Sequence, residues 1–303
     1  MPDPGDYEAA AAGLTLDRME IEDGGTNPAQ LAAAIHRQLG DDEGPVPVQA
    51  IARALDIYDI RVAPLIGIEA ALVTTPERTE GAIVVHQAAS RQRQRFSIGH
   101  ELGHFLNPRH SAAWGDGFRC DRGDLSGRVR SPVRRAPTRY EVQERQANTF
   151  AIELLAPRRR LRPYLDADPD LRHALELAKG LDISREAAFR RFAELHDASV
   201  AIVFAHRDRF SYAIRGRSFP ALALTRKAQM PWLPQLSSAQ MYTDVEEAES
   251  TDWVQTPMSG PMYAQTLYQD EQRSTTLLIC DDAEDDEGGG IEDAAARLGR
   301  FGR

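Results

Sequence analysis

Apolar residues in the first part of the chain recur at helical spacing between short turn signals. Asn27 is a helix-capping residue followed by Pro28 at a first helical position, and together they predict a helix over 28–39 that ends at Gly40. The same periodicity predicts a second helix over 46–55. The chain therefore begins its ordered part with two helices.

The pattern then changes to short β-rich runs. Segments 60–65, 70–74 and 81–86 are separated by turn residues and predict three strands. A longer helix follows from about Ser90, and the Asn107-Pro108 pair ends it. Its apolar residues can face a core. Two small residues of this helix, Gly99 and Gly103, would let a neighbouring backbone approach closely.

Helical and β-like segments also alternate beyond the middle of the chain. Helices are predicted over 169–179 and 184–196, a hairpin over 200–205 and 210–214, and β-like runs over 262–268 and 274–280. Residues 1–26 mix Asp, Gly, Ala and Pro and are expected to be a mobile tail with a short helix around 7–14. Residues 281–303 are expected to be an acidic, disordered tail.

The run His100-Glu101-Leu102-Gly103-His104 lies inside the helix that starts near Ser90. Residues four apart share a helix face, so both imidazoles can converge on one metal ion while Glu101 acts as a general base on water. This pattern predicts a zinc site. The competing interpretation is a chance match, in which both histidines are ordinary polar residues on a surface helix.

A catalytic zinc ion needs three protein ligands and an open position for water. A helix predicted over 140–155 and ended by Pro157 carries two candidates one turn apart, Glu144 and Glu141. Glu144 lies on the flank of the apolar stripe that would pack against the first helix, where its carboxylate can reach the metal. Glu141 remains the competitor.

The segments R-F-S-I-G-H-E-L-G-H-F-L (95–106) and E-R-Q-A-N-T-F-A-I-E-L-L-A-P (144–157) resemble the two signature blocks of the ImmA/IrrE family of bacterial metallopeptidases. The resemblance extends over roughly residues 30–200. It implies Zn²⁺ ligands at His100, His104 and Glu144 and a general base at Glu101. Mild departures from the family pattern occur at Ser97, Gly99 and Ala156.

With this resemblance, the pattern predicts an α+β fold in five parts. A mobile tail (1–26) precedes a zincin-like peptidase core with a small sheet and an active-site helix (27–158). A helical extension similar to a helix-turn-helix (159–198), a small β-rich C-terminal region (199–280) and the acidic tail (281–303) follow. In a zincin-like layout, an edge strand can pair with an extended substrate backbone.

Several residues near the motifs have open roles. An oxyanion-stabilising donor could be any of four side chains, His110, Tyr140, Tyr164 and His173. Asn148, one turn after Glu144, is expected either to orient a metal ligand or to bond a nearby backbone group. Cys120 lies in an insertion over 109–139 and is expected to be idle rather than a metal ligand or a redox sensor.

Composition and charge restrict the location and the partners. No apolar run is long enough to span a bilayer, the N-terminus lacks a secretory pattern, and Cys120 and Cys280 form no disulfide framework, so a cytoplasmic protein is expected. The net charge of −10 argues against indiscriminate nucleic-acid binding. Central arginines could form a basic surface or simply a solvated loop and helix end: Arg128, Arg130, Arg134, Arg135, Arg139, Arg158, Arg159, Arg160 and Arg162.

Two functions are consistent with these features. The first is a zinc-dependent, site-specific endopeptidase that, as the resemblance implies, cuts a DNA-binding helix-turn-helix repressor controlling a stress or mobile-element response. The second is a DNA-binding regulator with a structural or vestigial zinc site. In that case the helix over 184–196 would enter a DNA groove with Arg185, Arg190 and Arg191. An intact Glu101 favours the first, because a structural site has no use for a general base.

Overall fold

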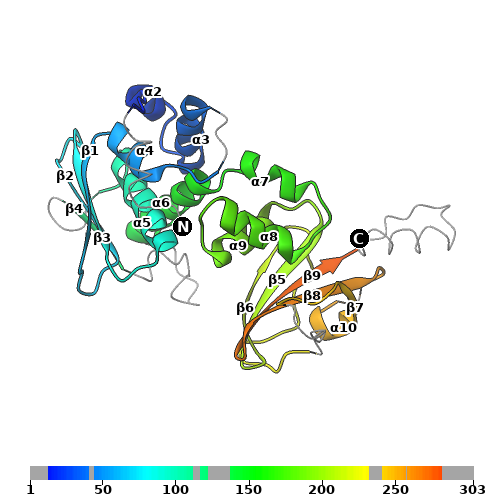
Figure 1. The fold of residues 1–303 in the computed structure, drawn as a ribbon. Coiled ribbons are helices and arrows are strands. Elements are labelled where there is room, and N and C mark those ends of the chain that lie inside the picture. Colours follow the sequence, from blue (N-terminus) through cyan, green and yellow to red (C-terminus); the bar gives the residue numbers. More distant parts are fainter. Residues whose placement is uncertain are drawn as a thin grey trace. The chain divides into compact units, whose positions relative to one another are not determined.

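The computed structural model describes residues 13–40, 44–111, 117–121, 137–231, 241–256 and 258–281. The expected helix around 7–14, most of the 109–139 insertion and the acidic tail beyond 281 lie outside the described residues, apart from short flanking pieces. Within the described residues the fold is mixed, with helices and two small sheets, so the predicted α+β class is confirmed (Figure 1). None of the described helices is both long and apolar enough to cross a membrane.

The chain divides into two compact units. Unit 1 comprises residues 1–160 and 179–184, and unit 2 comprises 161–178 and 185–303. The helical segment expected as an extension of its own thus falls mainly within the same unit as the β-rich region. The reason is packing between the helical segment and the β-rich region. Phe189 of the helical segment contacts Phe204 in the first strand of the β-rich region (Ser199–His206), with ring centroids 6.1 Å apart.

Unit 1 contains a four-stranded sheet whose helices lie along one face (Figure 1). Its elements are α2 (Arg18–Asp23), α3 (Pro28–Leu39), α4 (Val48–Ala54), β1 (Ile57–Ala63), β2 (Ala70–Thr74), β3 (Gly81–His86), α5 (Arg91–Leu106), β4 (Gly117–Cys120) and α6 (Arg139–Leu155). The strand order is β1-β3-β2-β4, with β1 parallel to β3 and the other pairs antiparallel. The two predicted N-terminal helices, the three predicted strands and the two motif helices are all present.

The sheet turns alternate side chains toward the helices, as strand geometry requires. Leu72 of β2 pairs with Ile83 of β3 on one side and with Phe118 of β4 on the other, and all three side chains are buried. The next row along the same face ends in Cys120, which pairs with Ala70. This buried face packs against α5 and so sets the distance between the motif helix and the sheet.

Ordered structure begins before the expected start at Asn27. Residues 18–23 form α2, capped by the Asp17 side chain, which accepts a hydrogen bond from the Glu20 amide at 3.0 Å. Ile21 is fully buried, so tertiary packing stabilises a six-residue helix that would be too short to persist alone. Residues 1–26 were expected to be a mobile tail, and this expectation is wrong for residues 18–23, which form a packed helix.

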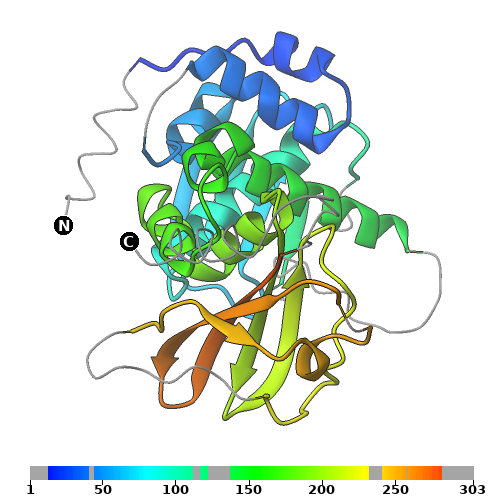
Figure 2. The same cartoon turned by 90° about the vertical axis from the view of Figure 1, so that its right-hand side faces the viewer.

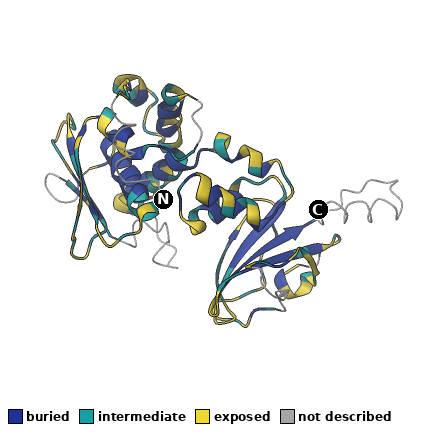
Figure 3. Ribbon diagram, viewed as in Figure 1, coloured by how far each residue is buried: buried dark blue, intermediate teal, exposed yellow. Residues whose placement is uncertain are grey.

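Unit 2 contains a five-stranded antiparallel sheet of order β6-β5-β9-β8-β7 (Figure 2). Its elements are α7 (Arg158–Leu165), α8 (Leu171–Gly180), α9 (Arg185–Leu195), β5 (Ser199–His206), β6 (Arg209–Arg215), β7 (Glu246–Ala248), α10 (Ser250–Trp253), β8 (Met262–Asp270) and β9 (Arg273–Cys280), although α7 and α8 each have residues assigned to unit 1. The predicted hairpin is β5–β6. The central strands are buried on both faces (Figure 3).

Candidate metal centre

Helix α5 buries the whole H-E-x-x-H motif. Ser90 caps the helix by accepting a hydrogen bond from the Arg93 amide, and the helix ends at Asn107, as predicted. His100, Glu101 and His104 are each 0% exposed. The alternative in which the histidines lie on a surface helix is therefore wrong.

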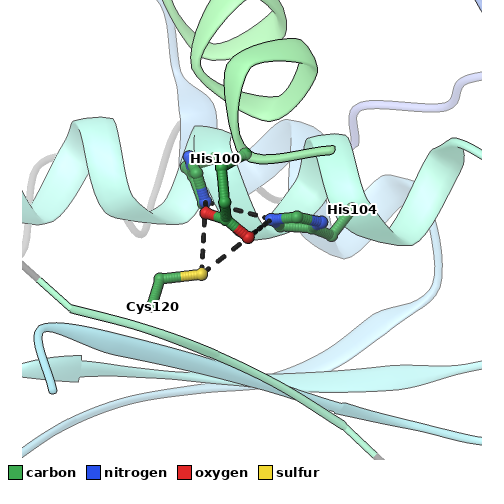
Figure 4. A group of neighbouring side chains, drawn as sticks. His100, His104 and Cys120 are labelled. Carbon is green, nitrogen blue, oxygen red and sulfur yellow. Dashed lines mark hydrogen bonds and ion pairs between the residues drawn. The ribbon is translucent and has the colours of Figure 1, made fainter. Parts of the chain in front are cut away.

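Both imidazoles point to one place between α5 and the sheet (Figure 4). The Nε2 atoms of His100 and His104 lie 3.1 Å apart. Helix α6 brings Glu144 to the same point, with Oε2 3.2 Å from His100 Nε2 and Oε1 3.3 Å from His104 Nε2. The three residues that the sequence predicted as zinc ligands are thus brought together.

Cys120, expected to be idle, is part of the same group. Its Sγ lies 3.2 Å from His100 Nε2 and 3.9 Å from His104 Nε2, and the residue is fully buried (Figure 4). One ligand atom from each of His100, His104, Cys120 and Glu144 lies within 4.8 Å of the others. No spacing signal in the sequence marks Cys120, because β4 brings it to the histidines by pairing with a strand distant in sequence.

The group has the chemistry and spacing of a metal site. Ligand nitrogens at about 2.0–2.1 Å from a tetrahedral zinc ion lie about 3.3 Å from each other. The 3.1–3.3 Å separations among the His100, His104 and Glu144 atoms are close to that value. Imidazole, carboxylate and thiolate are all zinc ligands, so these side chains could hold a metal ion.

Hydrogen bonds orient both imidazoles toward the centre. Asn148 Oδ1 lies 3.0 Å from His100 Nδ1. A carbonyl oxygen can only accept, so the His100 proton lies on Nδ1 and the Nε2 lone pair faces the group. Asn148 therefore orients a candidate ligand, the first of the two roles that the sequence left open.

His104 is oriented through a chain of two further side chains. His110 Nε2 lies 3.0 Å from Gln146 Oε1, and His110 Nδ1 lies 2.9 Å from His104 Nδ1. If His110 donates its proton to Gln146, its Nδ1 accepts from His104 Nδ1–H, which again leaves the His104 Nε2 lone pair facing the group. His110 is buried, and both of its ring nitrogens have partners, an arrangement that can position His104.

The protonation states of the side chains in this group favour binding of a cation. Burial lowers the pKa of His104 to about 3 and that of His110 to about 4, so both rings are neutral. Burial alone would raise the pKa of Glu144, but the adjacent imidazoles of His100 and His104 outweigh burial and lower that pKa to about 2. A neutral imidazole and an ionised carboxylate are the forms that bind metal.

Arg78 holds the end of α5 in place. Its guanidinium donates to the backbone carbonyls of His104, Asn107 and His110, and the first of these distances is 3.1 Å. The same side chain lies over the Phe118 ring, 5.7 Å from its centroid. One arginine therefore connects the C-terminal end of α5, the turn that carries His110 and strand β4, a role that the sequence did not indicate.

The other sequence candidates lie elsewhere. Glu141 forms the capping box of α6, with Oε2 accepting from the Thr138 amide at 2.7 Å. Tyr140 is 39% exposed, and Tyr164 and His173 are neighbours within unit 2, with ring centroids 6.5 Å apart. Among the described members of the basic set, Arg159 and Arg160 donate to the carbonyls of Gly40 and Gly44. Arg128, Arg130, Arg134 and Arg135 lie outside the described residues.

Comparison with known protein families assigns part of unit 1. Residues 58–113 match the model of a peptidase family described as the IrrE N-terminal-like domain. The match includes His100, Glu101 and His104 and ends before Cys120 and Glu144. It confirms the resemblance to the ImmA/IrrE family over this segment, and the matched family is of metallopeptidase type.

Other comparisons add little to the IrrE N-terminal-like assignment. A solved structure of a Mycobacterium tuberculosis transcriptional regulator is similar over 88% of this chain and 82% of that chain, with 13% sequence identity and a TM-score of 0.48. Similarity at this level carries no argument about function. Comparison with curated proteins gave no match.

Proposed function

We propose that this protein is a zinc-dependent endopeptidase that cuts a protein substrate at a specific site. The observation that carries the proposal is the convergence of His100, His104 and Glu144 beside a buried Glu101, on a helix whose segment matches a peptidase family. A carboxylate at this motif position has a catalytic use and no structural one.

The residues of the site would have three separate roles: binding the metal, orienting its ligands and transferring a proton. His100, His104 and Glu144 would hold Zn²⁺, and Asn148 and His110 would keep the two imidazoles aimed. A bound zinc ion supplies Lewis-acid chemistry, polarising a peptide carbonyl and lowering the pKa of water. Glu101 would accept the proton of the attacking water and return it to the leaving amine.

The proposed substrate is a DNA-binding helix-turn-helix repressor controlling a stress or mobile-element response, in the cytoplasm. This rests on the family resemblance and on one physical argument. A peptidase among other cytoplasmic proteins must be selective, and a site reached only by an extended segment leaves folded neighbours intact. Unit 2 is a candidate surface for recognising the folded part of such a substrate.

One observation favours a second candidate, a DNA-binding regulator with a structural metal site. Cys120 supplies a possible fourth ligand, and four protein ligands are typical of structural zinc. Against it, the α8–α9 pair has a weak basic face. Arg191 is only 4% exposed, and Arg190 lies 3.9 Å from Glu194, so the three arginines expected to contact DNA are not all available.

The experiment that separates the two candidates replaces Glu101 by Gln. The variant should bind zinc as the wild type does, because Glu101 is not a ligand, and should lose cleavage of a helix-turn-helix repressor by about 10²-fold or more. Metal analysis and cleavage are measured on the same samples, in the natural sequence and in a Cys120→Ser background. Unchanged cleavage by fully loaded Glu101→Gln protein would contradict the assigned role.

A further inference from the structure

We propose that β4 is a self-inhibitory segment, in which Cys120 is a fourth metal ligand and the strand backbone covers the sheet edge that a substrate would use. The inference rests on the proposed peptidase function and adds a mode of regulation to it. Three features of β4 support it: the position of the strand on β2, the side chains that the strand turns toward α5, and the glycine at its start.

Strand β4 occupies the outer edge of β2. Leu72 pairs with Phe118 and Ala70 with Cys120 in antiparallel register, and the Glu69 amide donates to the Cys120 carbonyl at 2.9 Å. Because the order is β1-β3-β2-β4, removing β4 would leave β2 as the edge strand beside the motif helix. An edge strand next to a metal centre is where an extended peptide can pair. The chain's own segment already fills that place.

Alternate residues of β4 face the metal group. Phe118 stacks on His104 with ring centroids 4.5 Å apart, and Cys120 places its Sγ among the candidate ligand atoms. Arg119 between them is exposed. The strand thus covers His104 with an aromatic ring and places a thiol among the candidate ligand atoms, with both side chains buried.

The start of β4 is fitted closely to β2. A Cβ atom at Gly117 would lie 2.5 Å from the Leu72 carbonyl oxygen, a contact that only a backbone shift could relieve. Glycine at this position therefore lets the two backbones approach, and any larger residue should loosen β4 without altering the thiol or the other ligands.

These contacts have a joint consequence for the chemistry. A metal ion held by two histidines, a glutamate and a thiolate has four protein ligands, whereas hydrolysis needs one position for water. A substrate that entered would have to displace the Cys120 thiolate from the metal and the β4 backbone from β2. Both displacements involve only non-covalent and coordinate bonds, so the inhibition is reversible.

Cobalt(II) tests the fourth ligand without relying on activity. The full-length wild type loaded with Co²⁺ should show the near-ultraviolet sulfur-to-cobalt charge-transfer band of a thiolate ligand. Cys120→Ser should bind Co²⁺ but lose the band. Cys280→Ser is the matched control, since Cys280 is also buried but lies on β9 in unit 2, and it should keep the band. A band that persists in Cys120→Ser would overturn the inference.

Gly117→Val tests the strand while keeping Cys120. The variant should show a weaker charge-transfer band, and both it and Cys120→Ser should cleave substrate at least about tenfold faster than the wild type, because a water position opens. Equal or lower cleavage by both variants, with their metal content intact, would overturn self-inhibition. Failure of every form to bind Co²⁺ would instead contradict the proposed function itself, so the two failures are distinguishable.

Discussion

Glu144 and Glu141 lie one turn apart on α6 and have different partners. Glu144 faces the Nε2 atoms of both motif histidines, while Glu141 closes the capping box with Thr138. Glu144→Ala should therefore weaken zinc binding far more than Glu141→Ala does, as a titration against a competing chelator would measure. Glu141→Ala should instead cost about 0.5–2 kcal/mol of unfolding free energy through loss of the cap. A larger loss of zinc affinity in Glu141→Ala would place the third ligand one turn away.

The sequence predicted the site only where its residues are close along a helix. His100, Glu101 and His104 follow from the four-residue spacing. The apolar stripe made Glu144 a candidate beside Glu141, and the family resemblance implied Glu144. Cys120 did not follow, since strand pairing with β2 and not helical spacing brings it to the histidines. His110 and Gln146 were missed as a positioning chain for a related reason, because the turn after α5 decides where His110 points.

The close approach of α5 and α6 depends on one of the two helix glycines. A Cβ at Gly103 would meet the Phe150 side chain at 3.0–3.2 Å, whereas a Cβ at Gly99 would meet Ala151 at an ordinary 3.4 Å. Alanine gains the same helix propensity at both positions, so the variants are matched. Gly103→Ala should be less stable than Gly99→Ala by about 1–3 kcal/mol in denaturant unfolding. Equal stabilities would mean that the helices have room to separate.

His36 ties α3 to α6 and should make stability depend on pH. Its Nε2 lies 2.8 Å from the Leu154 carbonyl oxygen, and burial lowers its pKa from 6.5 to about 4. The folded protein binds this proton less tightly than the unfolded chain, so the contribution is complete above pH 6.5 and is lost as the pH falls toward 4. The loss should amount to about 2–3 kcal/mol.

The measurement is the free energy of unfolding of metal-free protein at several pH values in this window. His36→Gln retains a donor for the Leu154 carbonyl but has no titrating ring, so its stability should decline less on acidification than that of the wild type. Parallel pH profiles for the two proteins would show that His36 does not titrate differently on folding.

Element boundaries were predicted well where local signals are strong. Asn27 caps the helix that it was expected to cap, the motif helix starts beside Ser90 as expected, and strands 70–74 and 81–86 have the predicted bounds. Elements stabilised by distant contacts were missed. Strand β4 has four residues, too few for an alternation to be recognised, and α2 is held by burial of Ile21 rather than by helix propensity.

At the scale of the whole molecule, the units are not separable at a single point in the chain. Asp182 belongs to unit 1 and pairs with Arg91 at the start of α5 at 2.6 Å, although residues on both sides of it belong to unit 2. A truncation after about residue 200 would also remove the sheet against which α9 packs. Substrate recognition is therefore best tested on the whole chain.

The proposed selectivity makes a clear prediction for substrates. The zinc-loaded protein should cut a folded helix-turn-helix repressor once and should leave unfolded casein-like proteins intact, because recognition of the folded part brings one loop to the site. Gel analysis of both substrates at equal enzyme concentration would show the difference. Extensive digestion of the unfolded protein would indicate a general peptidase instead.

The central claim is hydrolysis of one peptide bond by Glu101 and the metal group, and intact-mass spectrometry of the repressor tests it most directly. Incubation with the zinc-loaded Cys120→Ser protein should yield one pair of fragments whose masses sum to the substrate plus one water. The same protein carrying Glu101→Gln, or stripped of metal by a chelator, should leave the repressor whole. An identical fragment pair from the Glu101→Gln protein with full metal content would contradict the account.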